Sequence, residues 1–394
     1  MIAAALTAVL ALGMLTACEW PRRLFDGAVE AGLEGSFYSV PTPTPSGAPG
    51  DIVRSEPITS APDGVDAYRV VYHSTDLNGQ DILVSGVVAV PQGPAPDGGR
   101  TVIAWGHPTT GSMGRCAPSV GIDPFDLIEG FADLIARGYA VAYTDYSGMG
   151  LPGENAYLVG STEGRNVLDS VRAAQQLGVG ASERVAFWGH SQGGHAVLFA
   201  AQLADEYAPE LQVEAIAVAA PAVDLGELLD ADIDDISGVS IAAYAFDAYT
   251  SVYADTPGVT LESILVPDAV DVVPQMAKLC LLGQNSQLHA LGEPYIDGEF
   301  LIADPATTQP WVDLLQANTP GGVKLGVPLF VAQGATDTLV RPELTARFVA
   351  GQQALGTAVD SIVIPGTGHG LVALRAMPEL LPWLDAHAPA GAAR

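Results

Sequence analysis

One segment constrains the fold more than any other, because it joins a buried-type strand, a glycine-flanked serine and a helix. Residues 184–188 form a short apolar run that predicts a buried strand, and residues 196–203 have the apolar spacing that predicts a helix. Between them, residues 189–193 (Gly-His-Ser-Gln-Gly) match the pattern G-x-S-x-G. Strand, sharp turn and helix are the context in which this pattern forms a nucleophile elbow.

The turn at Ser191 is expected to have strained backbone angles. Gly189 and Gly193 flank the serine because a Cβ at either position would collide with the neighbouring strand or helix. The hydroxyl is then held above the sheet, where the N-terminus of the next helix favours developing negative charge. We therefore predict that Ser191 is a nucleophile. The alternative is a glycine-rich turn without function, and the flanking strand and helix argue against it.

The overall charge limits the classes of partner. The chain has 394 residues, enough for one large domain with an insertion or for two domains. Its net charge is −29, and its only lysines are Lys278 and Lys324. Binding of nucleic acid requires clustered lysine and arginine, so we expect no nucleic-acid partner. We interpret the acidity as a well-solvated surface.

The N-terminal segment predicts export. Residues 2–17 are apolar and uncharged, too short for a membrane span but typical of a signal-peptide core. They end in Leu-Thr-Ala before Cys18, which resembles a bacterial lipobox and implies cleavage before a lipidated Cys18. We therefore expect a lipoprotein-type signal peptide at 1–17, a tether at 18–35, and a secreted or cell-envelope protein with a membrane tether through Cys18. A plain signal peptide with an incidental cysteine is the alternative.

Export also changes the interpretation of the other cysteines. If Cys18 carries the anchor, Cys116 and Cys280 remain as an even pair in an oxidising compartment. We predict a disulfide between them. Two buried free thiols are the alternative.

Strands and helices alternate over most of the chain. Residues 68–73 and 82–90 have the partial alternation of opening antiparallel strands. Further strands are predicted at 101–105, 139–143, 213–219, 327–332 and 361–364, and helices at 161–177, 377–386 and from Asp123-Pro124 to Gly138. This order predicts an α/β fold with a mostly parallel sheet covered by helices on both faces.

The alternation stops between residues 223 and 322. This stretch contains acidic patches, prolines and helix-like pieces, and we predict that it is a mainly helical cap over the carboxyl edge of the sheet. Residues 36–222 and 323–394 would form the core. Residues 230–235 mimic the start of a calcium loop, but Asp235 replaces its glycine and Ile241 its closing glutamate. We interpret them as acidic surface and expect no metal.

Serine needs a general base, and two residues stand where its partners belong. Asp337 follows the strand at 327–332, and His369 follows the strand at 361–364. The order serine, acid, histidine is the one found with this type of elbow. The carboxyl ends of these strands meet at one edge of the sheet, so we predict that His369 takes the serine proton while Asp337 holds the imidazole tautomer.

The oxyanion loop is expected after the third strand, at residues 105–111. Pro108 has no N–H, so we assign the oxyanion hole to the backbone N–H groups of Thr109 and Gln192. His107 is predicted to brace this loop. The remaining histidines are interpreted as structural: His73, His190, His195, His289 and His387. Residues 242–246 and 261–265 either line an acyl pocket or pack the cap onto the core.

These residues together resemble the secretory lipase family, the fungal lipase A type with its bacterial relatives. The matching stretches are residues 37–38, 49–57, 106–111, 144–150, 157–160, 189–194, 333–337 and 368–369. The resemblance runs from about residue 36 to the end of the chain. It implies an α/β-hydrolase body, a helical cap inserted before the acid strand, and lipase or carboxylesterase activity without a cofactor. It also supports the 116–280 disulfide.

We therefore predict an exported serine ester hydrolase that acts on small-molecule or lipid esters through an acyl-enzyme. An acyltransferase that uses the same acyl-enzyme is the first alternative, and a serine peptidase is a weaker one. A binding protein with an inactive site is the third, and the intact set of Ser191, Asp337 and His369 argues against it.

Overall fold

The computed structural model describes residues 37–121 and 123–391. The predicted signal peptide and tether, with Cys18, lie outside the described residues. Among the described residues, no helix combines the length and the apolar composition that crossing a bilayer requires.

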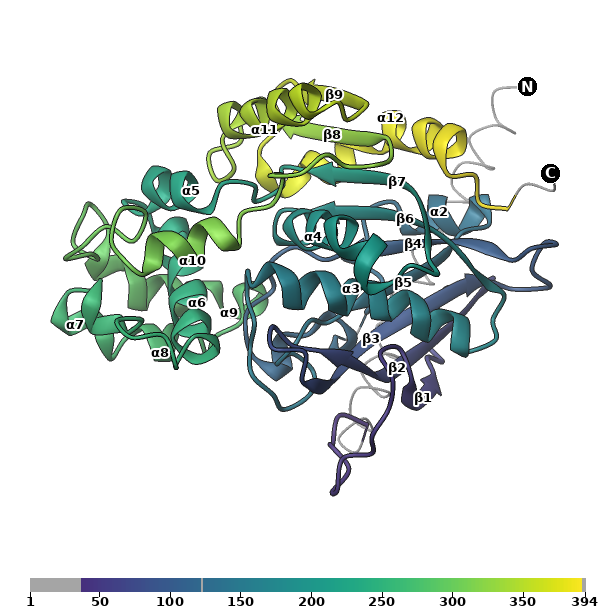
Figure 1. The fold of residues 1–394 in the computed structure, drawn as a ribbon, viewed down its shortest axis with the longest axis horizontal. Helices are drawn as coiled ribbons and strands as arrows, with labels where there is room; N and C mark the ends of the chain where they lie inside the picture. Colours follow the sequence, from purple (N-terminus) through teal and green to yellow (C-terminus); the bar gives the residue numbers. More distant parts are fainter. Residues whose placement is uncertain (1–36, 122, 392–394) are drawn as a thin grey trace, which may run out of the picture.

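The described chain is organised around a nine-stranded sheet with the order β1-β2-β3-β5-β4-β6-β7-β8-β9 (Figure 1). The strands are β1 Ile52–Pro57, β2 Val65–Thr75, β3 Asp81–Pro91, β4 Arg100–Gly106, β5 Ala140–Thr144, β6 Ala181–His190, β7 Gln212–Ala219, β8 Leu329–Gly334 and β9 Val359–Ile364. The pairs from β1 to β3, and β3 with β5, are antiparallel, whereas all later pairs are parallel. The predicted mostly parallel sheet with antiparallel opening strands is therefore confirmed.

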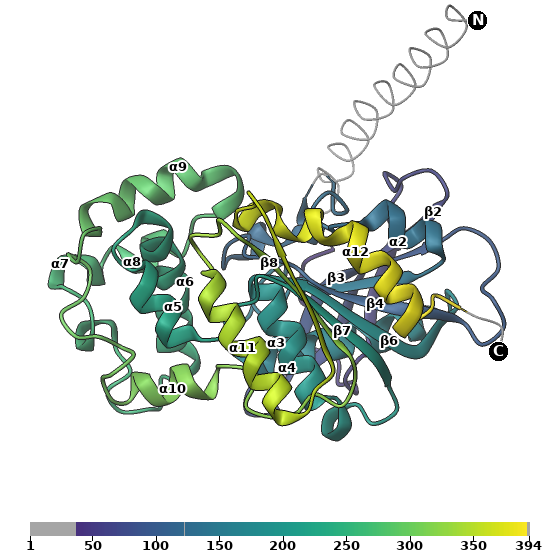
Figure 2. The ribbon, with the colours of Figure 1, turned by 90° about the horizontal axis from the view of Figure 1, so that it is seen from above.

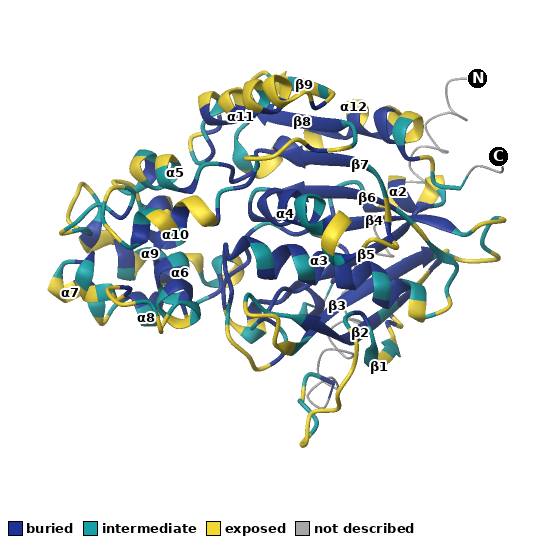
Figure 3. Ribbon diagram, in the orientation of Figure 1, coloured by how far each residue is buried: buried dark blue, intermediate teal, exposed yellow. Residues whose placement is uncertain are grey.

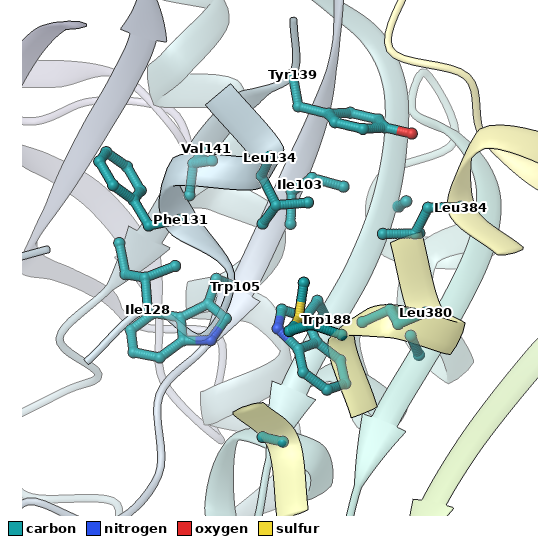
Figure 4. Packing of buried hydrophobic residues seen from close by; sticks show 14 of the residues in the cluster. Ile103, Trp105, Ile128, Phe131, Leu134, Tyr139, Val141, Trp188, Leu380 and Leu384 are labelled. Atoms are coloured by element: carbon teal, nitrogen blue, oxygen red, sulfur yellow. The ribbon is translucent and has the colours of Figure 1, made fainter. Parts of the chain in front are cut away.

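Helices cover both faces of the sheet (Figure 2). They are α2 Phe131–Arg137 and α12 Val372–His387 on one face, and α3 Gly160–Gln176, α4 Gln192–Tyr207 and α11 Pro342–Leu355 on the other. Successive side chains of a strand point to opposite faces. Trp105 of β4 accordingly packs with Trp188 and the α12 residue Leu380, as Figure 4 shows, whereas its neighbour Ala104 belongs to the cluster under α3 and α4.

The sequence predicts a helix with Asp123 as its N-cap and Pro124 as its first residue, but α2 begins seven residues after Pro124, at Phe131. Asp123 Oδ1 accepts a hydrogen bond from the backbone N–H of Phe125 (3.1 Å), so it closes a local turn instead of capping a helix. Gly130 then has φ of 82°, in the left-handed region, which a continuous right-handed helix excludes. The predicted end at Gly138 is confirmed: its φ is 96° and its N–H bonds back to the last turn.

Between β7 and β8 the described chain is mainly helical, and this is the stretch for which the sequence predicts a cap. The α-helices there are α5 Leu225–Asp232, α6 Ile236–Val252, α7 Pro267–Val270, α8 Val273–Met276, α9 Leu281–Gly292 and α10 Trp311–Ala317. The short 3-10 helices of the described residues as a whole are η2 Gly114–Cys116, η3 Pro118–Val120, η4 Leu261–Ser263, η5 Glu293–Tyr295 and η6 His369–Leu371. The cap has its own hydrophobic cluster, which includes Tyr244, Phe246 and Trp311. Figure 3 shows these buried segments beside the carboxyl edge of the sheet.

A disulfide and an ion pair connect the cap to the core. The predicted disulfide between Cys116 and Cys280 is present and joins the loop after β4 to the start of α9. Asp232 at the end of α5 is buried and lies 3.4 Å from Arg341, so residues 230–235 are not uniformly a solvated surface as the sequence suggested. The reason is tertiary, because Arg341 of the core lies beside this one carboxyl group. Burial raises the pKa of Asp232 to about 7 and outweighs the arginine, which lowers that pKa.

Candidate active site

The elbow has the strained geometry that the sequence predicts. Ser191 lies between β6 and α4 with φ of 57° and ψ of −119°. A Cβ added to Gly193 would lie 1.8 Å from the carbonyl oxygen of Gly106, and one added to Gly189 would lie 2.3 Å from that of Gly193. Both glycines are therefore required for the close approach of helix and strands. The turn presents the Ser191 hydroxyl at the carboxyl edge of the sheet.

The structure brings Ser191, His369 and Asp337 together. His369 Nε2 lies 2.9 Å from Ser191 Oγ, and His369 Nδ1 lies 2.9 Å from Asp337 Oδ2. The other carboxylate oxygen of Asp337 accepts hydrogen bonds from the backbone N–H groups of Leu339 and Val340, each at 2.9 Å. The carboxylate is thus fixed from behind, and it orients the imidazole toward the serine.

The environment favours a neutral imidazole beside an ionised carboxylate. Burial lowers the pKa of His369 below its usual value of about 6.5, the Asp337 hydrogen bond acts in the opposite direction, and nearby His190 lowers the pKa further. Burial raises the pKa of Asp337, but the hydrogen bond and charge of His369 and the two backbone N–H groups outweigh it, so the net shift is downward. At neutral pH, His369 therefore donates Nδ1–H to Asp337, and its free Nε2 accepts the Ser191 hydroxyl.

Thr109 and Gln192 lie at the same pocket as Ser191. Among the described residues, neither backbone N–H has a hydrogen-bond partner, as an oxyanion hole requires. The loop is braced by His107, whose Nδ1 lies 2.7 Å from the carbonyl oxygen of Pro108 and whose own carbonyl accepts from Tyr146 Oη (3.3 Å). The assignment of the Thr109 and Gln192 backbone N–H groups to the oxyanion hole stays a prediction.

An apolar pocket leads from Ser191 into the cap. Its empty volume, including the part open to solvent, is about 740 Å³. The cap contributes side chains from α5, α6 and α10, among them Leu228, Leu229, Ile241, Ala245, Phe246 and Leu315. Of the two cap segments considered from the sequence, residues 242–246 therefore contribute to the pocket. Ile264 and Leu265 of the other segment are buried in the hydrophobic cluster of the cap.

His190 lies closer to the site than the sequence suggested. Its ring centroid is 4.9 Å from that of His369, and its Nδ1 lies 3.0 Å from Oε1 of Glu129. Glu129 also accepts a hydrogen bond from the indole of Trp105 (3.0 Å). No local pattern marks Glu129, because Asp126 and Asp133 stand three and four positions away from it in the same segment. Three other histidines make their side-chain hydrogen bonds to groups other than Ser191: His73, His195 and His387.

Solved structures with the same architecture define the class of fold. Candida antarctica lipase A in its closed state superposes with a TM-score of 0.72 at 19% identity, covering 90% of this chain and 88% of that one. The rice cell wall degrading esterase LipA from Xanthomonas oryzae gives a TM-score of 0.69 at 19% identity, with 86% and 100% covered. These likenesses, with the sheet order and the elbow, confirm the α/β-hydrolase fold.

The sequence comparison is more specific. Residues 127–388 match the family model described as Secretory lipase, so the chain belongs to the secretory lipase family, as the sequence motifs suggested. This membership places the protein among the carboxylic ester hydrolases and agrees with export.

Two relatives illustrate the range of the family. The secreted triacylglycerol lipase LIP7 of Malassezia globosa is 24% identical over 379 residues, covering 89% of this chain and 78% of that protein. A protein of Mycobacterium tuberculosis named probable inactive lipase MT1628 is 28% identical over 212 residues, with 48% and 46% covered. The family thus includes a protein named as probably inactive, so the catalytic mechanism of this chain is argued from the residues around Ser191.

Proposed function

We propose that this protein hydrolyses acyl esters through a covalent acyl-enzyme on Ser191. The observation that carries the proposal is the continuous hydrogen-bonded chain from Ser191 through His369 to Asp337. A serine hydroxyl is a weak nucleophile until a base removes its proton, and the neutral Nε2 of His369 is within reach to do so.

Each step of the reaction has a residue to perform it. Ser191 Oγ attacks the ester carbonyl while its proton moves to His369 Nε2, and Asp337 stabilises the imidazolium that forms. The negative charge on the former carbonyl oxygen faces the backbone N–H groups of Thr109 and Gln192. His369 then returns the proton to the leaving alcohol. Water repeats the sequence on the acyl-enzyme, releasing the acid and restoring the Ser191 hydroxyl.

The pocket supports an apolar acyl group as the bound part of the substrate. Its lining is mainly apolar, with Asp232 as its one carboxyl group, and it continues from Ser191 between the cap helices. Several relatives are named triacylglycerol lipases, which agrees with a lipid ester as substrate. We propose that residues 223–322 act as the cap that binds this acyl chain.

The predicted N-terminal organisation also remains a proposal. Cleavage before Cys18 and a lipid on its sulfur would tether the enzyme to the cell envelope through residues 18–35. Release as a soluble secreted enzyme would follow if Cys18 is not modified.

The test uses the signal-free protein with a chain-length series of p-nitrophenyl esters and a fluorophosphonate probe. We expect hydrolysis of the esters and labelling located at Ser191 by mass spectrometry. If the protein shows no hydrolysis and no labelling, it is an inactive binding protein. Transfer of most acyl groups to an added alcohol, with little free acid, would favour an acyltransferase. Cleavage of an amino-acyl amide with no action on the esters would favour a peptidase.

The acid side of the pH profile should report His369. Only the neutral imidazole accepts the serine proton, so kcat/KM falls as pH drops through the pKa of His369. Burial lowers that pKa, so we expect the midpoint below about pH 6.5. Steady-state kinetics from pH 4 to 9 would measure it. A profile that stays flat down to pH 4, or a midpoint above pH 7, would contradict His369 as the base in this environment.

A further inference from the structure

A buried carboxylate lies directly behind the proposed oxyanion hole. Glu163 of α3 is fully buried, and both of its oxygens are engaged. Oε1 accepts hydrogen bonds from Gln192 Nε2 (2.7 Å) and from the backbone N–H of Leu158 (3.0 Å). Oε2 lies 2.8 Å from Nδ1 of His195, which is also fully buried. The carboxyl group is thus held by two N–H donors at Oε1 and by the imidazole at Oε2.

The partner histidine is held at both ring nitrogens. Nε2 of His195 lies 2.8 Å from the backbone carbonyl oxygen of Asn318, which can only accept a hydrogen bond. Nδ1 of His195 faces Oε2 of Glu163. A buried pair of this kind is weak evidence for stability, because desolvation offsets the attraction between its members, so its role is to be sought in what it positions.

The first group that the pair positions is Gln192. Among the described residues, Oε1 of Gln192 has no hydrogen-bond partner, so the bond from Nε2 to Glu163 is its side-chain anchor. Gln192 is also the residue directly after Ser191 whose backbone N–H is proposed to bind the oxyanion. Fixing its side chain limits rotation of the first turn of α4.

The second group is the loop that holds Thr109. Leu158 has a φ of 56°, an unfavourable value for leucine, and its backbone is held on both sides. Its N–H donates to Glu163, and its carbonyl accepts from Tyr249 Oη (3.1 Å). The adjacent residue, Tyr157, has its hydroxyl 2.7 Å from Thr109 Oγ1. Glu163 thus reaches both proposed oxyanion residues, Gln192 directly and Thr109 through Leu158 and Tyr157.

We propose that Glu163, paired with His195, is a positioning residue that aligns both halves of the oxyanion hole. This inference rests on the proposed function, because it concerns the same transition state. Glu163 touches neither Ser191 nor His369, so its removal should misplace the oxyanion donors without changing the base. Loss of an oxyanion donor typically lowers kcat by about 10²–10³, and misplacement should cost a part of that.

The test is Glu163→Gln in the signal-free enzyme. A glutamine amide has one accepting oxygen and one donating nitrogen, so it cannot reproduce both oxygens of the Glu163 carboxyl group. We expect kcat for a p-nitrophenyl ester to fall by about 10–100-fold with little change in KM. Affinity for a trifluoromethyl ketone, which mimics the tetrahedral intermediate, should fall by the same factor as kcat/KM. The acid midpoint of the pH profile should not move.

A matched control comes from the same helix. Asp169 of α3 is also fully buried and accepts hydrogen bonds from Ser74 (2.6 Å) and Tyr207 (2.8 Å), away from the pocket. Asp169→Asn should destabilise the fold while keeping kcat within about twofold of the wild type. A folded Glu163→Gln enzyme with wild-type kcat, or with a raised KM alone, would overturn the inference.

Two milder substitutions keep the inference testable if Glu163→Gln does not fold. Gln192→Ala and Tyr157→Phe each remove one connection and leave the pair of Glu163 and His195 intact. Each should lower kcat by about 5–50-fold, less than loss of a whole donor, and combining Gln192→Ala with Glu163→Gln should cost less than the product of the two. Wild-type kcat in both single variants would refute the positioning role. An inactive, unlabelled wild type would instead refute the proposed function.

Discussion

Replacing Ser191 with alanine is expected to lower kcat for ester hydrolysis by about 10⁴–10⁶-fold. The substitution removes the atom that forms the acyl-enzyme, and no other hydroxyl is placed 2.9 Å from His369 Nε2 among the described residues. The remaining activity would come from the oxyanion donors and from substrate binding, which together retain about 10³–10⁴ over water in comparable enzymes. Fluorophosphonate labelling should disappear.

The Ser191→Ala protein should fold. The backbone bonds of residue 191 do not involve the hydroxyl: its N–H donates to Ala219, and its carbonyl accepts from Ala222 and His195. Alanine also carries no more steric strain than serine at a φ of 57°. Ser170→Ala is a suitable control, since this buried serine of α3 donates to the carbonyl of Val167 away from the pocket. Retention of more than about one per cent of kcat would contradict the proposed nucleophile.

The proposed catalytic residues Ser191, Asp337 and His369 could be predicted because each stands next to a glycine pattern or a strand that is recognisable in the sequence. Gly193 reflects the close approach of α4 to β4, where an added Cβ would lie within 2 Å of Gly106, and Gly189 reflects the close approach of β6 to the first turn of α4. Asp337 follows the buried strand β8 and His369 follows β9, an edge strand whose residues are half-buried or exposed. Parallel strands bring their carboxyl ends to one edge of the sheet. A strand order and a few glycines were therefore sufficient to place three distant residues at one site.

The residues that support the site were not predictable in this way. Glu129 and Glu163 acquire their roles from side chains 61 and 32 positions away, His190 and His195. Nothing in the sequence around a single glutamate indicates such a partner. Asp232 is buried for the same reason, because Arg341 reaches it from the core. The late start of α2 has a local cause, since Gly130 adopts a left-handed conformation. Glycine permits this conformation but also adopts others, so its presence in the sequence does not predict it.

The edge strand β1 illustrates a different limit. Its sequence, Ile-Val-Arg-Ser-Glu-Pro, has no clear alternation, and its residues are half-buried or exposed. Strand prediction relies on the contrast between a buried and a solvated face. An edge strand that contributes little to the core gives little contrast, although β1 pairs with β2 over most of its length.

Replacing Asp337 with asparagine is expected to lower kcat by about 10⁴-fold, by an inversion of hydrogen-bond roles. Oδ1 of Asp337 accepts from the backbone N–H groups of Leu339 and Val340, which an asparagine oxygen would continue to satisfy. The new NH₂ group would then occupy the position of Oδ2, 2.9 Å from Nδ1 of His369. Nδ1 would have to accept instead of donate, which moves the ring proton to Nε2 and blocks the Ser191 hydroxyl from giving up its own.

This tautomer mechanism makes the expected defect selective. KM should change little, fluorophosphonate labelling should slow in parallel with kcat, and the thermal unfolding temperature should stay close to that of the wild type because both backbone bonds persist. Asp360→Asn is the matched control: this carboxylate of the adjacent strand β9 bonds the indole of Trp383 (2.8 Å) and should leave kcat unchanged. If Asp337→Asn kept kcat within tenfold of the wild type, Asp337 would not be the residue that sets the His369 tautomer. The neighbouring carboxylate of Glu129, which reaches His369 only through the ring of His190, would then be the next residue to replace.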